Sequence, residues 1–271
     1  MIQETTASLI ADFVVKVLAQ CPEKRPLFIG LNGPQGSGKT TATRSAVELL
    51  AERHHLRGIA ISIDDFYLTR EAQVKLAEQF APNPYLKQRG YPGTHDIRLG
   101  SKKFAELSEI NAAPLPVLIP RYDKSLHDGE GDRCPEAEGT SVSPPLDFVI
   151  LEGWCVGFTP VEKERISDAN LLQVNALLAA YSDWYRFLDA LIQLRAENIH
   201  DTVRWRIEAE QNMRAQGKAG MSDERISAYI GRFLPAYDLY LPQLEKKPPK
   251  ISPRLVIDIG SDRGVIGTQQ F

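Results

Sequence analysis

The sequence predicts an α/β fold in which short buried strands alternate with helices. Three apolar runs, 27–31, 59–63 and 148–151, have the aliphatic and β-branched composition of fully buried strands. Segments with apolar residues at helical spacing lie before, between and after these runs. The length of 271 residues allows a sizeable core and is compatible with one large α/β domain or two small ones.

Composition narrows the class of protein and of partner. With 43% hydrophobic and 25% charged residues, the chain is an ordinary globular protein. A net charge of −3 argues against nucleic acid or an anionic membrane and favours small-molecule partners. Three cysteines without a C-x-x-C pair fit reduced thiols. Without a charged-then-apolar leader or a run of about 18 apolar residues, we expect a cytoplasmic protein.

The first two elements are a helix over residues 5–20 and a strand over 27–32. A loop fitting G-x-x-x-x-G-K-T follows the strand and leads into a helix from residue 39 to about 53. Its glycines allow backbone N–H groups to surround a nucleotide phosphate at a helix N-terminus. Lys39 would reach the β- and γ-phosphates, and the Thr40 hydroxyl would bind Mg²⁺. The candidate nucleotide-binding residues are Gly33, Pro34, Gln35, Gly36, Ser37, Gly38, Lys39, Thr40 and Thr41.

The second strand, 59–63, ends on Asp64 and Asp65. Ligands of open α/β sheets bind beyond the carboxyl ends of the strands, so both carboxylates would face the phosphates. Either one could accept a proton from an attacking hydroxyl. The alternative is that these carboxylates cap a helix, and this alternative has more support for Asp65 than for Asp64.

Two polar loops and two helices precede the third strand. Thr69 can cap a helix ending near residue 80, and another helix is predicted over 97–108. The turn-rich segment 88–96 is either a surface connection or a binding loop, with equal support from composition. A strand at 117–120 leads into a charged loop over 121–133. The polar candidates in these two loops are Arg89, His95, Asp96, Tyr122, Asp123, Lys124 and Arg133.

The third strand, 148–151, ends on Glu152, the expected ligand of Mg²⁺ and its water in a protein with a phosphate loop. Residues 161–189 have a helical pattern, and strands are predicted at 191–195 and 254–259. A helix over 201–216 carries Arg206 and Glu210 at i,i+4 spacing, and Ser222 can cap another helix. That spacing favours a solvated, ion-paired face over an arginine-bearing lid.

Together these strand ends predict phosphoryl transfer. That reaction needs positioning, charge neutralisation by Mg²⁺ and cations, and a base for the attacking hydroxyl. A GTPase-like switch is disfavoured because N-K-x-D is absent. A non-catalytic ATP-binding regulator remains an alternative, although the presence of Asp64 argues against it.

The ordered motifs G-P-Q-G-S-G-K-T, S-I-D-D-F-Y-L-T, R-G-Y-P-G-T-H-D, P-R-Y-D-K-S and V-I-L-E-G-W resemble the D-glycerate 3-kinase-like family. This family belongs to the phosphate-loop kinases, with uridine kinase, phosphoribulokinase and bacterial pantothenate kinase. The resemblance spans about residues 27–260. It implies a P-loop NTPase fold, with a parallel five-stranded sheet, helices on both faces and a helical lid, and transfer of the ATP γ-phosphate to a small hydroxylated metabolite.

The resemblance also assigns roles to residues. It implies Asp64 as the base, Lys39 as a catalytic cation, and arginines such as Arg204, Arg206 or Arg214 closing over the phosphates. It places substrate near Gly93–Asp96 and near Tyr122, Asp123 and His127. We add Asp65 and Tyr67, the neighbours of the base, to the expected substrate-binding residues. We expect a single domain over 1–271, with an acceptor-side insertion at about 66–145 and a lid at about 198–247.

The expected acceptor is D-glycerate, giving 3-phosphoglycerate. A small hydroxy acid needs a cation for its carboxylate, for which Arg89, Lys124 and Arg133 are candidates, and polar partners for its hydroxyls, for which His95, Asp96 and Asp123 are candidates. A nucleoside would need more aromatic surface. Uridine-kinase-like or pantothenate-kinase-like acceptors remain alternatives, and the oligomeric state is open.

Overall fold

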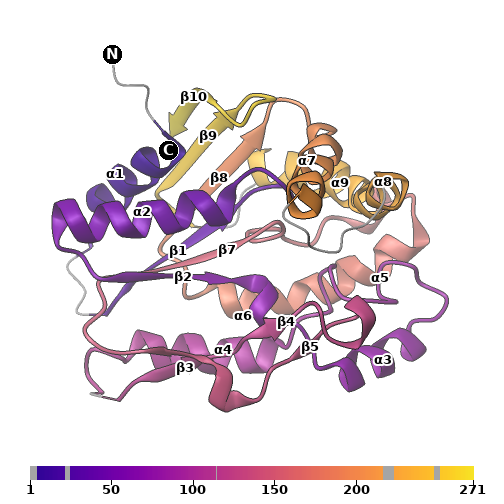
Figure 1. Ribbon diagram of the computed structural model, residues 1–271, viewed down its shortest axis with the longest axis horizontal. Coiled ribbons are helices and arrows are strands. Elements are labelled where there is room, and N and C mark those ends of the chain that lie inside the picture. Colours follow the sequence, from indigo (N-terminus) through magenta and orange to yellow (C-terminus); the bar gives the residue numbers. More distant parts are fainter. Residues whose placement is uncertain (1–4, 22–24, 114, 216–222, 247–250) are drawn as a thin grey trace.

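A computed structural model describes residues 5–21, 25–113, 115–215, 223–246 and 251–271. Its centre is a six-stranded sheet in the order β10-β9-β8-β1-β7-β2, with helices on both faces (Figure 1). The strands are β1 Leu27–Asn32, β2 Gly58–Ser62, β7 Phe148–Gly153, β8 Ala190–Ala196, β9 Arg254–Ile259 and β10 Val265–Gln270.

Five of these strands are parallel, as expected from the sequence, and the register aligns the ends that carry the predicted chemistry. β1 pairs with β7 and β8, β7 also pairs with β2, and β8 pairs with β9. Ser62 lies opposite Glu152, and Asn32 lies opposite Gly153. The ends of β1, β2 and β7 therefore meet at one edge of the sheet.

The sixth strand, β10, is antiparallel to β9 and is an addition to the five-stranded sheet that we expected. Val265–Gln270 gave no strand signal because it is mostly exposed and half polar. An edge strand pairs on one side only and does not need the continuous apolar run of a central parallel strand.

One face of the sheet is covered by α1 Thr6–Leu18 and α2 Lys39–His54. Thr5 caps α1 as part of a reciprocal pair with Ser8. The buried side of α1 packs with α2 on the alternate residues Leu27, Ile29 and Leu31 of β1. This packing fixes the helix that begins at the phosphate loop.

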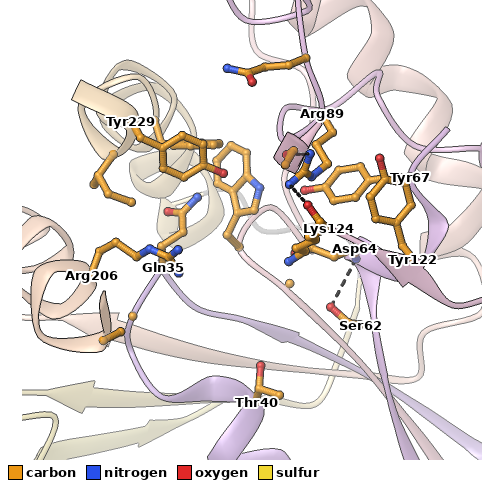
Figure 2. Close-up of a pocket in the computed structure, with 18 of the residues that line it drawn as sticks. Gln35, Thr40, Ser62, Asp64, Tyr67, Arg89, Tyr122, Lys124, Arg206 and Tyr229 are labelled. Atoms are coloured by element: carbon orange, nitrogen blue, oxygen red, sulfur yellow. Dashed lines mark hydrogen bonds and ion pairs between the residues drawn. The ribbon is translucent and has the colours of Figure 1, made fainter. Parts of the chain in front are cut away.

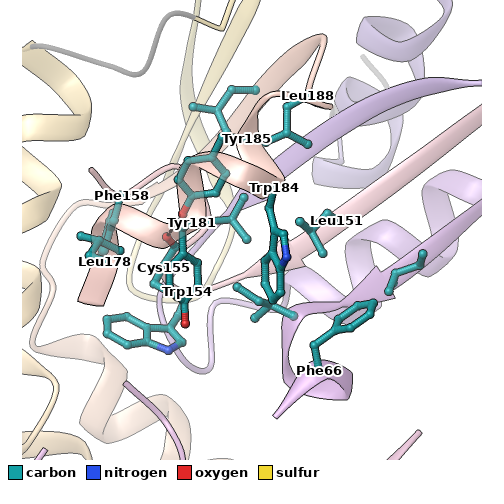
Figure 3. Packing of buried hydrophobic residues seen from close by; sticks show 14 of the residues in the cluster. Phe66, Leu151, Trp154, Cys155, Phe158, Leu178, Tyr181, Trp184, Tyr185 and Leu188 are labelled. Carbon is teal, nitrogen blue, oxygen red and sulfur yellow. Dashed lines mark hydrogen bonds between the residues drawn. The ribbon is translucent and has the colours of Figure 1, made fainter. Parts of the chain in front are cut away.

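The other face carries an aromatic core beneath α4 Ile97–Ser108, α5 Ala169–Leu178 and α6 Ser182–Tyr185 (Figure 3). Trp184 is fully buried, with its ring centroid 5.5 Å from that of Phe66 and 5.6 Å from that of Phe104. Phe66 directly follows the acidic pair at the end of β2. The turn that carries Asp64 and Asp65 is therefore anchored from below by aromatic packing.

The expected helix over 161–189 is shorter and is interrupted. Asp168 caps α5 by accepting a hydrogen bond from the Asn170 N–H, so the regular helix begins only at Ala169. The segment before it is held by Asn175, whose side chain bonds both the N–H and the carbonyl of Val161. Polar side chains thus make the helix begin later than the apolar spacing alone predicted.

The segment between β2 and β7 contributes helices and two small two-stranded antiparallel sheets, and its described residues add no strand to the central sheet. Its helix α3 Arg70–Gln79 begins after Thr69, as predicted. β3 Val117–Ile119 pairs with β6 Thr140–Val142, and β4 Tyr122–Asp123 pairs with β5 Asp132–Arg133. The described residues form 3₁₀ turns at Ile63–Phe66, His127–Gly129, Glu136–Glu138, Lys163–Arg165 and Ala179–Tyr181.

Three helices near the C-terminus gather on one side of the molecule (Figure 1). They are α7 Asp201–Ala215, α8 Asp223–Gly231 and α9 Leu234–Lys246. The helix cap predicted at Ser222 falls outside the described residues. Throughout the described ranges, helices fall short of the length and apolar character that crossing a bilayer requires.

Candidate active site

The loop between β1 and α2 has the backbone that phosphate binding requires. Gly36 and Gly38 adopt left-handed φ angles of 77° and 83°, which residues with a Cβ rarely accept. A Cβ at Gly36 would also lie 2.6 Å from the Cβ of Trp205. Gly38 precedes α2 without a side-chain cap, so the first N–H groups of the helix are left for an anion.

Distant residues hold this loop in place. Arg263, from the turn between β9 and β10, donates from Nε to the Gly36 carbonyl at 2.7 Å. The Tyr237 hydroxyl of α9 bonds the side-chain oxygen of Gln35 and accepts from its backbone N–H at 3.0 Å. The Lys39 amino group lies 3.4 Å from the Pro34 carbonyl, a weak contact that leaves the cation available. The loop is therefore supported before any nucleotide binds.

Thr40 and Glu152 meet at the base of the site. The Thr40 hydroxyl donates to Oε1 of Glu152 at 2.9 Å. Glu152 is 4% exposed, and its Oε2 has no hydrogen-bond partner among the described residues. A buried carboxylate oxygen without a partner beside a hydroxyl is a donor set that Mg²⁺ accepts, together with nucleotide phosphates and water. The residues present therefore fit the predicted metal.

Asp64, at the end of β2, forms an ion pair with Lys124 in which Nζ and Oδ2 are 2.5 Å apart. Burial favours the neutral acid, but the charge and hydrogen bond of Lys124 outweigh burial and lower the pKa of Asp64 to about 2. Its carboxylate is thus ionised at neutral pH. Asp65 differs, because burial and the charge of Asp64 raise its pKa to about 6, partly offset by the Tyr122 N–H.

His95 lies behind the site. Its ring stacks on Tyr67 at 4.5 Å between centroids, and its Nδ1 is 2.5 Å from the Tyr181 hydroxyl. His95 is 3% exposed, and burial lowers its pKa to about 4, so the ring is neutral. Tyr67 in turn hydrogen-bonds Asp64. In this structure His95 supports Tyr67 and does not line the cavity.

Asp96, Asp123 and Arg133 also lie away from the cavity. Asp96 caps α4 through the Leu99 N–H and pairs with Arg133 at 3.1 Å. Arg133 also donates to the Tyr67 carbonyl at 2.7 Å. Asp123 accepts hydrogen bonds from the backbone and hydroxyl of Ser125. The structure shows these side chains shaping the acceptor-side loops, and their predicted contact with substrate stays a prediction.

A cavity of about 1220 Å³ joins the phosphate loop to the acceptor-side loops. Figure 2 shows Thr40 and Ser62 at its base, with Asp64 and Lys124 on one side and Arg206 and Tyr229 on the other. The predicted residues that line it are Gln35, Gly36, Lys39, Thr40, Asp64, Asp65, Tyr67, Arg89, Tyr122, Lys124, Glu152 and Arg206.

Arg206 forms the ion pair expected on α7, although on a buried rather than a solvated carboxylate, and its role in a lid stays a prediction. Its guanidinium pairs with the buried carboxylate of Glu210, as the i,i+4 spacing predicted, and it also lines the cavity. Arg204 is half exposed and pairs with Asp201 at 3.3 Å. The side chain of Arg214 is outside the described residues.

Comparison with known proteins identifies the family. No model of a known protein family matches the chain. The chain is 38% identical over 247 residues to the chloroplastic D-glycerate 3-kinase of Arabidopsis thaliana, covering 89% of this chain and 54% of that protein. The match to the D-glycerate 3-kinase structure from Cryptococcus neoformans has a TM-score of 0.91 and 32% identity, and it covers 99% of this chain and 100% of the other. The chain belongs to the D-glycerate 3-kinase family.

A third relative matches along nearly its whole length. It is the probable ATP-dependent kinase TDA10 of Saccharomyces cerevisiae, 38% identical over 283 residues, with 98% of this chain and 97% of that protein covered. All three relatives are thus named as kinases, one of them as a probable ATP-dependent kinase, and phosphate-loop kinases generally use Mg²⁺. The resemblance drawn from the motifs is confirmed.

Several residues of this kinase site had no signal in the sequence. Arg263 and Tyr237 contact a loop more than 200 positions away. Trp205, on α7, packs directly against Gly36. Arg232 lines the cavity from the turn between α8 and α9. Only the presence of helices at the predicted lid position could have suggested that side chains from this region reach the loop.

Proposed function

We propose that this protein transfers the γ-phosphate of ATP to the 3-hydroxyl of D-glycerate, giving ADP and 3-phosphoglycerate. The observation that carries the proposal is a cavity that combines a phosphate loop, an ionised carboxylate at the end of β2 and cationic side chains on the acceptor side. A nucleotide and a small hydroxy acid could bind there side by side. The naming of two relatives as D-glycerate 3-kinases supports this choice of acceptor.

The nucleotide end of the site would hold the metal and the phosphates. Thr40 and Glu152 would hold Mg²⁺, which neutralises phosphate charge when bound. Lys39 would contact the β- and γ-phosphates, and the N–H groups at the start of α2 would bind the β-phosphate. Arg206 would contact the phosphates from α7. These groups neutralise charge that spreads over the transferred phosphoryl oxygens.

Asp64 would act as the base. It accepts the proton of the attacking hydroxyl while the new O–P bond forms and the bond between the γ-phosphorus and the bridging oxygen breaks, releasing ADP. Its lowered pKa keeps the carboxylate ionised and ready to accept a proton at neutral pH. Tyr67, fixed by His95 and by the Arg133 contact with its carbonyl, would hold Asp64 in position.

The acceptor end suits a small, charged molecule better than a nucleoside. Arg89 and Lys124 bring positive charge to the acceptor side of the cavity. The guanidinium carbon of Arg89 lies over the Tyr122 ring, 5.7 Å from the ring centroid. The Tyr67 ring already stacks on His95, so one face of it is not available to a nucleobase. Asp65 also lines the cavity and would contact a second hydroxyl.

Three further proposals concern the whole chain. We propose that the chain is one kinase domain over 1–271 with an acceptor-side insertion at about 66–145. We also propose that α7, α8 and α9 act as the lid expected at about 198–247, because residues from all three contact the phosphate loop or the cavity. Cytoplasmic location stays a prediction, and the name of the Arabidopsis relative places that protein in the chloroplast.

The test is ADP production by the purified protein with Mg²⁺ and a panel of acceptors. D-glycerate should stimulate ADP release more than uridine, pantothenate or ribulose 5-phosphate, and ³¹P spectroscopy should identify the product as the 3-phosphate. If another acceptor is preferred, the kinase assignment stands and the substrate is wrong. Binding of ATP without turnover on any acceptor would support the regulatory alternative.

A further inference from the structure

Arg232 is a cavity residue whose guanidinium lies against two neighbouring aromatic rings. It lies in the turn between α8 and α9, and its guanidinium carbon is 5.4 Å from the ring centroid of Tyr229 and 5.6 Å from that of Phe233. Its Nε and Nη2 atoms are buried and have no hydrogen-bond partner among the described residues. Buried donors without partners are rare, and they are most easily explained by a ligand that completes them.

The two unpartnered nitrogens form one edge of the guanidinium. Nε–H and the adjacent N–H of Nη2 point in the same direction, and this pair of parallel donors matches the two oxygens of a carboxylate. A lysine could not present that geometry, because its ammonium is a point charge. The geometry of Arg232 therefore specifies a planar anion.

Other cations near the acceptor already have partners within the chain. Lys124 forms its ion pair with Asp64. Arg89 donates to the backbone carbonyls of Lys124, Gly129 and Glu130. Arg133 lies outside the cavity lining. A carboxylate bound to Arg232 would gain hydrogen bonds without breaking any of these contacts.

The position of Arg232 is on the acceptor side. Its Nη2 lies 3.7 Å from where a Cβ of Gly90 would be, in the loop after Arg89. The Tyr91 hydroxyl donates to the Arg232 carbonyl and fixes the backbone. Figure 2 shows Tyr229, which stacks on Arg232, facing Arg89 across the cavity.

We propose that Arg232 binds the carboxylate of the acceptor and selects a hydroxy acid over a neutral polyol. This inference rests on the proposed function and deepens it, because it assigns the residue that recognises the acid. The aromatic stacking holds the guanidinium in one orientation, which lowers the ordering cost of binding. The bound carboxylate would then place a hydroxyl of the same small molecule toward Asp64.

The experiment compares Arg232→Met and Arg232→Lys with wild type. Arg232→Met should raise the KM for D-glycerate on the order of ten- to a hundredfold, the usual effect of removing a hydrogen-bonded charged partner, with the KM for ATP nearly unchanged. Arg232→Lys should give an intermediate KM. The preference for D-glycerate over glycerol should shrink in Arg232→Met. The control is Arg186→Met, which removes an exposed guanidinium stacked on Phe187 at 5.1 Å, outside the cavity lining.

A second readout does not require turnover. With a non-hydrolysable ATP analogue and Mg²⁺, D-glycerate should raise the melting temperature of wild type and of Arg186→Met, and should not raise that of Arg232→Met. Equal stabilisation of wild type and Arg232→Met by D-glycerate, or by the acid that the acceptor panel identifies in its place, overturns the proposal. An equal rise in KM for ATP also overturns it, because Arg232 would then contact the nucleotide.

The outcomes separate this proposal from the proposed function. If wild type phosphorylates D-glycerate and Arg232→Met leaves its KM unchanged, the function stands and the role of Arg232 is wrong. If the preferred acceptor is a different carboxylic acid whose KM rises in Arg232→Met, the carboxylate site stands and the choice of D-glycerate is wrong. If only neutral acceptors are phosphorylated, both are wrong.

Discussion

Asp65 should be a carboxylate that the fold holds at a cost in stability, and Asp65→Asn tests this directly. Burial and the neighbouring charge of Asp64 raise the pKa of Asp65 to about 6, from an ordinary value of 3.8. A carboxyl with a raised pKa in the folded state binds its proton more tightly there than in the unfolded chain. Its ionisation therefore destabilises the fold as pH rises from about 4 to about 6, and the full cost is present above that window.

The magnitude follows from the size of the shift. About two pKa units at about 1.4 kcal/mol each correspond to nearly 3 kcal/mol. The introduced amide would keep an oxygen that can accept from the Tyr122 N–H but would lose the stronger bond to a charged acceptor. We therefore expect Asp65→Asn to stabilise the protein by about 1–3 kcal/mol at pH 8. For a chain of this length, that raises the melting temperature by roughly 2–6 °C.

The assay is chemical or thermal unfolding of wild type and Asp65→Asn, without nucleotide, from pH 4 to pH 8. The stability difference should be near zero at pH 4 and should grow through pH 6. Asp64→Asn is the matched control, and it should destabilise the protein. Because the fold lowers the pKa of Asp64, its ionised carboxylate stabilises the folded state above pH 3.8. A loss of stability in Asp65→Asn at pH 8, or a difference that does not vary with pH, would refute the reasoning.

Four other predictions concern the kinase site. Asp64→Asn should lower kcat by about 10²–10⁴-fold with little change in the KM for ATP, and the assignment of the base is wrong if Asp65→Asn is the more damaging change. Lys39→Met should lower turnover by at least about 10²-fold without changing the melting temperature, as measured by ADP release and thermal unfolding. Glu152→Gln should raise the Mg²⁺ concentration for half-maximal rate by about 10-fold or more, and an unchanged Mg²⁺ titration counts against its role as a ligand. Gly36→Ala should weaken ATP binding measured by calorimetry, because its Cβ would be 2.6 Å from the Cβ of Trp205. Gly231→Ala should not, because no atom of the described residues lies within 4 Å of its added Cβ.

Much of the fold was predictable because its central elements carry strong local signals. The strand, loop and helix around residues 27–54 combine a buried apolar run with the glycines that the loop geometry demands. The helix over 97–108 and the cap at Thr69 were found with correct bounds. The errors lie where local signals are weak or misleading, as in the polar edge strand β10 and in the helical pattern of 161–168.

The candidate site divides in the same way. Asp64, Asp65 and Glu152 were found because each follows an apolar strand, and parallel strands bring their carboxyl ends to one edge. Arg133 was chosen from loop composition, and His95 from loop composition and the family resemblance. Neither criterion can tell a side chain facing the cavity from one buried beneath it. In the structure both contact Tyr67 from behind.

The sequence by itself determined the reaction class, the phosphate loop, the acidic strand ends and the family, because each of these depends on residues that are adjacent or ordered along the chain. Only the tertiary structure decided which acceptor-side cations are already paired and that Arg232 keeps two donors without a partner among the described residues. Lys124 forms an ion pair with Asp64, 60 positions away in the sequence, and Arg263 donates a hydrogen bond to Gly36, 227 positions away. Arg232 is held by rings that pack in three dimensions. Such pairings depend on how separate elements pack together, and no local pattern of residues contains that information.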